Sequence, residues 1–215
     1  MLSMKPINMR IRYLFLFVVC LSLIQPAAHA QHTSLDMQVL NEMMENRHED
    51  PVEFYQHISN TTNYISMLVP ASVLATGLVR GDKITINKGL YMAETLVAST
   101  LITTGLKETF KRNRPSQNHP WIVPASDAGS PSFPSGHTSE AFATATSLTL
   151  SYPKWYVAVP AYAWASTVGY SRMYLGVHYP SDVLAGAIVG AGSAWLMFKV
   201  NKWMAHKKAA PVPVN

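Results

Sequence analysis

Residues 171–182 read SRMYLGVHYPSD, and they place a guanidinium, an imidazole and a carboxylate close together, at Arg172, His178 and Asp182. Charged residues make up only 13% of the chain, so this grouping stands out from its surroundings. Apolar segments flank the stretch on both sides, which is typical of a connection between two helices. The stretch therefore indicates a functional site held at the ends of apolar helices.

Five apolar segments with almost no internal charge follow residue 60, and their lengths are typical of helices. Most are a little shorter than the roughly 20 apolar residues that cross a bilayer, and Glu94 lies inside one of them. The pattern predicts an all-α helical bundle, either embedded in a membrane or soluble. The segments cover residues 64–79, 90–106, 141–152, 155–170 and 183–200.

The charges of the connecting loops favour the membrane alternative. If the mature chain begins on the exported side, the connections assigned to the cytoplasm are rich in lysine and arginine, as the positive-inside rule requires. Gly186 and Gly190, four residues apart, would also let the last helix approach a neighbour closely. We therefore predict about five transmembrane helices. The cytoplasmic cations are Arg80, Lys83, Lys88, Lys154, Lys199, Lys202, Lys207 and Lys208.

The first 30 residues have the pattern of a secretory signal peptide. Lys5, Arg10 and Arg12 precede an apolar run at 13–24, and a small-residue site ends at Ala30. We expect cleavage after Ala30, with an uncleaved anchor as the alternative. In both cases the chain enters an export pathway.

The composition of the remaining chain excludes two classes of function. The only cysteine, Cys20, lies in the leader, so no disulfide framework or thiol chemistry is expected after cleavage. The leader carries three of the five net positive charges, and the remaining +2 is too weak to indicate nucleic-acid binding. We divide the chain into the leader (1–30), an N-terminal surface helical segment (31–60), a helical core (61–203) and a polar C-terminal tail (204–215).

The surface segment is predicted to form helices. Leu35, Val39 and Leu40, with Met43 and Met44, are expected on one apolar face of the first helix. Asp50-Pro51 has the pattern of a second helix start, with proline at the first helical position.

The exported loops also carry cations, and these fall in three short motifs, each at the end of a predicted helix. They are K-x6-R-P at 107–115, P-S-G-H at 134–137 and S-R-x5-H-x3-D at 171–182. Any one motif is weak, but three in this order at helix boundaries are specific. Together they resemble the type 2 phosphatidic acid phosphatase superfamily, which includes lipid phosphatases, soluble bacterial acid phosphatases and vanadium haloperoxidases.

The residue types in these motifs suit an anionic phosphoryl group. Lys107, Arg114 and Arg172 provide three positive charges, and the two guanidiniums can bind phosphate oxygens in a forked geometry. Ser135 and Gly136 precede a predicted helix, whose free backbone N–H groups favour an anion. We predict no metal ion, because the three cations would compete with it. A plain helix cap is the alternative role for Ser135.

Two histidines provide the reactive groups. A neutral imidazole is a nucleophile, and Asp182 follows His178 at a spacing that lets its carboxylate hold one ring nitrogen while the other faces phosphorus. The resemblance implies the same assignment, with a phosphohistidine intermediate. It also implies that His137 protonates the leaving alkoxide. Two structural histidines beside a helix N-terminal carboxylate are the alternative.

Other polar residues near the motifs are expected to be peripheral. We interpret Lys111 and Arg112 as lipid-headgroup contacts or solvated loop charges. His48, His57 and His119 are expected in loops or on the surface, since none of them belongs to one of the three motifs.

The resemblance thus implies a phosphoric monoester hydrolase acting on a lipid phosphate or pyrophosphate, without a cofactor. Membrane lipid, and no nucleic acid, is the expected partner. The expected location is the inner membrane, with the active site on the periplasmic side. A soluble periplasmic acid phosphatase of broad specificity is the alternative, and a vanadate-dependent haloperoxidase is less favoured because the chain is small. The sequence leaves the lipid and the oligomeric state open.

Overall fold

The structure is a computed structural model that describes residues 35–48, 50–127 and 129–209. Within these ranges every regular element is a helix, which confirms the all-α prediction. The expected leader, with its cleavage site after Ala30, and residues 210–215 of the expected tail lie outside the described residues. The helices are α2 (Leu35–Glu45), α3 (Asp50–Arg80), α4 (Lys83–Phe110), α5 (Pro115–Asn118), α6 (Gly136–Ser151), α7 (Trp155–Tyr174) and α8 (Pro180–Ala209).

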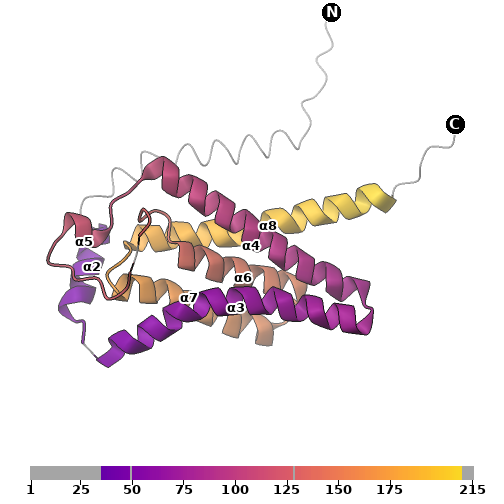
Figure 1. The fold of residues 1–215 in the computed structure, drawn as a ribbon, viewed down its shortest axis with the longest axis horizontal. Helices are drawn as coiled ribbons and strands as arrows, with labels where there is room; N and C mark the ends of the chain where they lie inside the picture. Colours follow the sequence, from indigo (N-terminus) through magenta and orange to yellow (C-terminus); the bar gives the residue numbers. More distant parts are fainter. Residues whose placement is uncertain (1–34, 49, 128, 210–215) are drawn as a thin grey trace, which may run out of the picture.

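The five long helices α3, α4, α6, α7 and α8 form an elongated bundle (Figure 1). Each predicted apolar segment lies within one of them, apart from Tyr152, which caps the C-terminus of α6. α6 is the central helix, because it packs against each of the other four. The short helices α2 and α5 lie at one end of the bundle, and the turn between α3 and α4 lies at the other (Figure 1).

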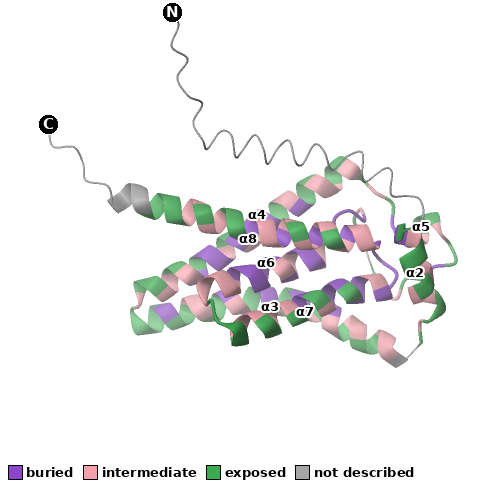
Figure 2. Cartoon of the chain, turned by 180° about the vertical axis from the view of Figure 1, so that it is seen from behind, coloured by how far each residue is buried: buried purple, intermediate pink, exposed green. Residues whose placement is uncertain are grey.

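Small side chains line the central helix. The buried positions of α6 are all Ala, Ser or Thr, and in Figure 2 much of α6 has the colour of buried residues. Small residues allow neighbouring backbones to approach closely. The hydroxyl of Ser139 is 2.7 Å from Ser99 Oγ and accepts a hydrogen bond from Thr103 Oγ1 at 2.8 Å. These bonds fix α6 against α4 close to the start of α6.

The predicted close approach through Gly186 and Gly190 is confirmed. A Cβ added at Gly186 would lie 2.6 Å from the Ser135 carbonyl oxygen, and one added at Gly190 would overlap the Ser139 carbonyl oxygen. Only glycine allows this contact between α8 and α6. The first turns of the two helices are therefore held side by side, and both turns carry motif residues.

Large apolar side chains cover the outer faces of the bundle. Exposed apolar surface of this extent is typical of a membrane or partner contact. By length and composition, two helical segments of the described chain could cross a membrane, Pro51–Arg80 and Pro180–Ala205. Side chains exposed by 60% or more include Leu68, Val97, Leu101, Val159 and Ile188.

The N-terminal segment is part of the fold rather than a surface addition. α2 buries Asp36 and Leu40, whereas Leu35 and Val39, which were expected on its apolar face, are exposed. Leu40 packs against Tyr179, in the loop that carries His178. The predicted face is thus confirmed for Leu40 and Met44, which pack in this cluster, and wrong for Leu35 and Val39, because a buried carboxylate completes the inward face of this helix.

Helix boundaries also differ from the proposed divisions of the chain. α3 begins at Asp50, as the Asp-Pro pattern predicts, but it continues through residue 60 to Arg80. Ser59 and Thr62 are both buried, so the same helix face stays inside on either side of residue 60. α8 likewise continues past residue 203, where the core was expected to end.

Candidate active site

The motif residues lie at helix ends, so the bundle topology gathers three distant segments. Each side chain is positioned by the first or last turn of a helix or by the residue that caps it. Lys107 and Arg172 lie in the last turns of α4 and α7, Arg114 and Ser135 cap the N-termini of α5 and α6, and Asp182 lies in the first turn of α8.

His178 and Asp182 form a buried pair at the start of α8. His178 Nδ1 is 3.5 Å from Asp182 Oδ2, and the two residues are 2% and 0% exposed. The same carboxylate oxygen accepts hydrogen bonds from Ser132 Oγ at 2.5 Å and from the Tyr179 N–H at 2.9 Å. The carboxylate therefore faces Nδ1. The other ring nitrogen, Nε2, lies 3.3 Å from Arg114 Nη1.

Burial controls the ionisation of His178. Loss of solvent lowers the pKa of its imidazole, Asp182 partly offsets this effect, and the positive charges of Arg114 and Arg172 lower the pKa further, to about 3. The imidazole is therefore neutral at physiological pH. The neutral form is the one that can act as a nucleophile.

The three cations of the motifs have neutral partners. Arg114 and Arg172 are buried and Lys107 is half-buried. Within the described residues none of the three forms a salt bridge with a carboxylate. Their charges are therefore left to attract an anion. Arg114 donates to the carbonyl oxygens of Ser130 and Val177, Arg172 donates to Ser59 Oγ, and Lys107 donates to the Pro131 carbonyl oxygen.

The N-terminus of α6 adds backbone donors beside these cations. Ser135 caps the helix without a side-chain capping bond, and its Oγ accepts a hydrogen bond from Thr138 Oγ1 at 2.9 Å. A Cβ added at Gly136 would lie 4.0 Å from Lys107 Cε, so the first turn of α6 runs next to the lysine side chain. Free N–H groups at a helix start attract anions. The serine therefore lies at the start of the helix, and its side chain makes no capping hydrogen bond.

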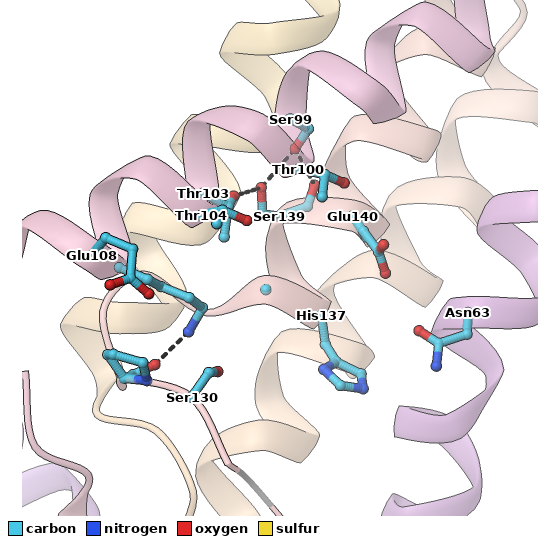
Figure 3. Close-up of a pocket in the computed structure, with 13 residues that line it drawn as sticks. Asn63, Ser99, Thr100, Thr103, Thr104, Glu108, Ser130, His137, Ser139 and Glu140 are labelled. Carbon is cyan, nitrogen blue, oxygen red and sulfur yellow. Dashed lines mark hydrogen bonds between the residues drawn. The ribbon is translucent and has the colours of Figure 1, made fainter. Parts of the chain in front are cut away.

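A cavity of about 320 Å³ opens next to this helix start. Lys107, Gly136 and His137 belong to its lining, together with residues of α3 and α4. Figure 3 shows His137 and Glu140 on α6, with Asn63 on the neighbouring α3. His178 is not part of the lining. The cavity thus gives direct access to two of the three motifs.

A sequence model of the PAP2 superfamily matches residues 88–205 of this chain, a range that contains every motif residue described above. The chain belongs to the PAP2 superfamily. This agrees with the resemblance that the three motifs carry.

The sequence similarity to curated PAP2 relatives covers only part of each protein. A lipid A 4'-phosphatase of Bacteroides thetaiotaomicron is 37% identical over 99 residues, which are 43% of this chain and 42% of that protein. An undecaprenyl-diphosphatase of Sulfolobus acidocaldarius is 38% identical over 77 residues, 36% of this chain and 37% of that protein. The chain therefore spans less than half the length of these relatives.

Two solved structures extend the PAP2 similarity to most of the chain. The crystal structure of Aquifex aeolicus LpxE gives a TM-score of 0.65 at 26% identity, over 78% of this chain and 96% of that chain. The transmembrane PAP2-type phosphatidylglycerolphosphate phosphatase of Bacillus subtilis gives 0.69 at 25% identity, over 88% and 94%. The arrangement of the helices is thus shared with both.

Sequence reasoning missed three residues next to the PAP2 motifs, namely Ser132, Arg112 and Asp36. The interpretation of Arg112 as a solvated charge is wrong, because its side chain is 8% exposed and bonds to Asp182 Oδ1 at 2.6 Å and Asp36 Oδ2 at 2.8 Å. Arg112 precedes Arg114 by two residues, but its charge alone does not reveal its partners. Asp36 lies outside the family match, and no sequence signal marks it. Lys111 is exposed.

Other candidate ligands are dispersed. As expected, His48 and His57 are exposed, and His119 lies in a loop with its ring centroid 6.1 Å from that of Trp121. Within residues 35–48, 50–127 and 129–209, no group of three or more His, Cys, Asp or Glu side chains is arranged to hold a metal ion. The charged groups that do converge are those of the PAP2 motifs, together with Arg112 and Asp36.

Proposed function

We propose that this PAP2 chain is a phosphatase that hydrolyses a lipid phosphate monoester or pyrophosphate through a phosphohistidine intermediate. The observation that carries the proposal is the convergence of Lys107, Arg114 and Arg172 around His137, with the two arginines also close to His178. Within the described residues, none of the three cations forms a salt bridge with a carboxylate. A transferring phosphoryl group keeps its negative charge on the equatorial oxygens. Fixed cations aimed at these oxygens stabilise the transition state.

In the first step, Nε2 of neutral His178 attacks phosphorus while the bond from phosphorus to the ester oxygen breaks. Asp182 accepts a hydrogen bond from protonated Nδ1, which orients the ring and stabilises the positive charge that forms on it. His137, at the cavity wall, gives its proton to the departing oxygen, so that a neutral alcohol leaves. The product of this step is phosphorylated His178.

In the second step, water attacks the phosphoryl group and the bond between phosphorus and His178 breaks. His137, now neutral, takes the proton of the water, and inorganic phosphate leaves. The two arginines hold phosphate oxygens in both steps, and Lys107 and the N–H groups of Gly136 and His137 hold the remaining charge. We propose a metal-independent reaction, because these cations supply the charge neutralisation that a divalent ion provides elsewhere.

We also propose that the chain is embedded in the inner membrane, with its site on the periplasmic side. In this arrangement α3, α4, α6, α7 and α8 are the five spans and follow a cleaved leader. Support comes from the apolar outer faces of the bundle and from the lysines and arginines of the loops opposite the site. The leader (1–30) remains part of this proposal, whereas the boundaries expected at residues 60 and 203 fall inside α3 and α8.

The substrate that we favour carries its phosphate on a polar headgroup. The cavity walls come from α3, α4 and α6, and Glu140 and Asn63 place a carboxylate and an amide near His137 (Figure 3). Such groups bind hydroxyls, which a sugar or polyol headgroup has and a prenyl chain lacks. The relatives named as lipid A phosphatases and undecaprenyl-diphosphatase supply the first two substrates to compare.

The histidine roles can be tested with two leaving groups. His178→Ala removes the nucleophile, so turnover should fall to background on every ester. His137→Ala removes the general acid, which typically contributes about 10²- to 10⁴-fold, and the loss should be larger for a lipid phosphate than for nitrophenyl phosphate. Because His137 is also the base for water attack, this variant should accumulate an acid-labile phosphoenzyme after rapid quench.

His119→Ala is the matched control, since it removes a histidine of the loop outside the cavity lining. If the burst rate of His137→Ala falls equally on the lipid phosphate and on nitrophenyl phosphate, and no phosphoenzyme is trapped, the roles given to the two histidines are contradicted. Release of the protein from membranes by a high-pH wash supports the soluble acid phosphatase instead, and bromide oxidation in added vanadate supports the haloperoxidase.

A further inference from the structure

Asp36 connects α2 to the start of the catalytic helix α8. Its Oδ1 accepts a hydrogen bond from the Ser181 N–H at 2.9 Å, and its Oδ2 accepts one from Ser181 Oγ at 2.5 Å. Asp36 is 6% exposed. The carboxylate thus satisfies a free backbone donor of the first turn of α8, where a negative charge is favoured. The contact with Ser181 explains why an acid of α2 is buried. Asp36 also contacts a second residue, Arg112.

The second partner is Arg112, which lies between two carboxylates. Its Nη2 donates to Asp36 Oδ2 at 2.8 Å, and its Nη1 donates to Asp182 Oδ1 at 2.6 Å and to Ser181 Oγ at 2.7 Å. The guanidinium carbon lies 4.1 Å from the centre of the Tyr179 ring, which supports the guanidinium from one side. The three charged groups form a row from α2 to the carboxylate that contacts His178.

The row leaves Oδ2 of Asp182 facing the catalytic imidazole, and this oxygen is also held by hydrogen bonds from Ser132 Oγ and the Tyr179 N–H. A guanidinium facing a single carboxylate tends to bind both of its oxygens in a fork. Here Asp36 takes Nη2, so Arg112 holds only Oδ1 of Asp182, and Oδ2 faces His178 Nδ1 at 3.5 Å. Two carboxylates and one guanidinium also leave one net negative charge. Without Asp36, Arg112 would neutralise Asp182 fully.

We propose that Asp36 is a positioning residue, which acts through Arg112 to hold the Asp182 carboxylate against His178. The proposal rests on the proposed function, in which His178 is the nucleophile. It makes α2, which lies outside the matched PAP2 segment, a part of the catalytic arrangement. A purely structural role for α2 would leave the catalytic step unchanged.

The kinetic test compares Asp36→Asn with Glu42→Gln in the full-length protein. Glu42 is an exposed acid of the same helix, so its variant removes an equal charge without touching the row. We expect Asp36→Asn to lower kcat on a lipid phosphate by about 10- to 100-fold with KM within about twofold, as for a misplaced catalytic group. Glu42→Gln should match the wild type.

A double-mutant cycle identifies the path of the effect. If Asp36 acts through Arg112, the Asp36→Asn substitution should change kcat by less than about twofold in an Arg112→Gln background. Additive effects of the two substitutions would overturn the proposal. So would an Asp36→Asn variant whose kcat is unchanged and whose thermal unfolding temperature alone falls.

A binding measurement keeps the test independent of turnover and of the folded fraction. Orthovanadate mimics the transition state and requires an oriented His178, whereas inorganic phosphate requires only the cations. Asp36→Asn should weaken vanadate binding about tenfold and phosphate binding less than about twofold, measured by calorimetry on the same sample. Equal weakening of the binding of both anions refutes the positioning role but not the proposed function. A wild-type protein that binds neither anion refutes the proposed function, and the positioning role with it.

Discussion

Replacing Gly186 by alanine tests whether the contact between α6 and α8 sets the geometry of the site. The added Cβ would lie 2.6 Å from the Ser135 carbonyl oxygen, whereas ordinary contacts begin at 3.4 Å, so the helix starts must separate by about 0.8 Å. Gly186 follows Asp182 by one turn, and Ser135 caps the helix that carries His137. A displacement near 1 Å at a catalytic group costs about 10²-fold. We expect kcat to fall by about 10- to 100-fold.

The effect on stability is smaller because two terms oppose each other. Overpacking costs about 1–3 kcal/mol, and alanine gains up to about 1 kcal/mol over glycine in a helix. The free energy of unfolding of Gly186→Ala should therefore fall by about 1 kcal/mol. In the control Gly192→Ala, on the same helix, the added Cβ meets nothing within 4 Å. That variant should be slightly more stable than the wild type, with unchanged kcat.

Initial rates on a lipid phosphate and thermal unfolding in detergent measure both quantities on one sample. A Gly186→Ala variant with wild-type kcat would refute the idea that this glycine contact positions the site. An equal loss of kcat in Gly192→Ala would also refute it, because helix composition rather than close contact would then be responsible.

Three further predictions concern charge, pH and topology. Arg172→Lys should lower kcat/KM by about 10²-fold or more, because an ammonium cannot replace the forked guanidinium. A near wild-type kcat/KM would mean that Arg172 has only a structural role, through its hydrogen bond to Ser59. Burial lowers the pKa of His178 to about 3 in the folded state, whereas the unfolded state binds this proton at about pH 6.5. The free energy of unfolding should therefore fall as the pH drops from about 6.5 toward 3. His178→Gln should lose less over the same range in thermal unfolding, and equal losses would contradict the lowered pKa of His178. A cysteine replacing Gly129 should react with an impermeant maleimide in intact cells, and one replacing Lys154 only after permeabilisation; equal labelling contradicts the five-span arrangement.

The sequence was sufficient for the helices and for the motif positions. Each long helix contains one apolar segment, and each motif lies where a segment ends, so a bundle of such helices brings the motifs together at one end. The close approach at Gly186 and Gly190 was also predictable, because small residues four apart on an apolar helix have few other uses.

Contacts that depend on distant charges were not predictable. Asp36 and Arg112 are 76 positions apart, and each on its own has the pattern of a surface charge. Burial of either one requires the other, so the charge of one residue carries no information until its partner is known. Leu35 and Val39 were placed on the inward face of α2 for the same reason. Continuity of α3 through residue 60 follows from a buried Ser and Thr, which hydropathy counts as polar.

The charges around His178 divide into two groups according to their partners. Arg112 is neutralised between Asp36 and Asp182. Within the described residues, Lys107, Arg114 and Arg172 instead bond to carbonyl and hydroxyl oxygens, and Arg114 also contacts His178 Nε2. With His178 neutral, the four cations and two carboxylates sum to +2, and the protonated His137 of the first step is offset by the Glu140 carboxylate of the same cavity. A phosphate monoester carries about two negative charges at neutral pH, so a bound monoester would balance the group. Loss of the Asp36 charge would raise the group to +3. The same substitution should then shift the ratio of the two affinities toward pyrophosphate over inorganic phosphate, measured by calorimetry, while it slows the chemical step on both kinds of ester.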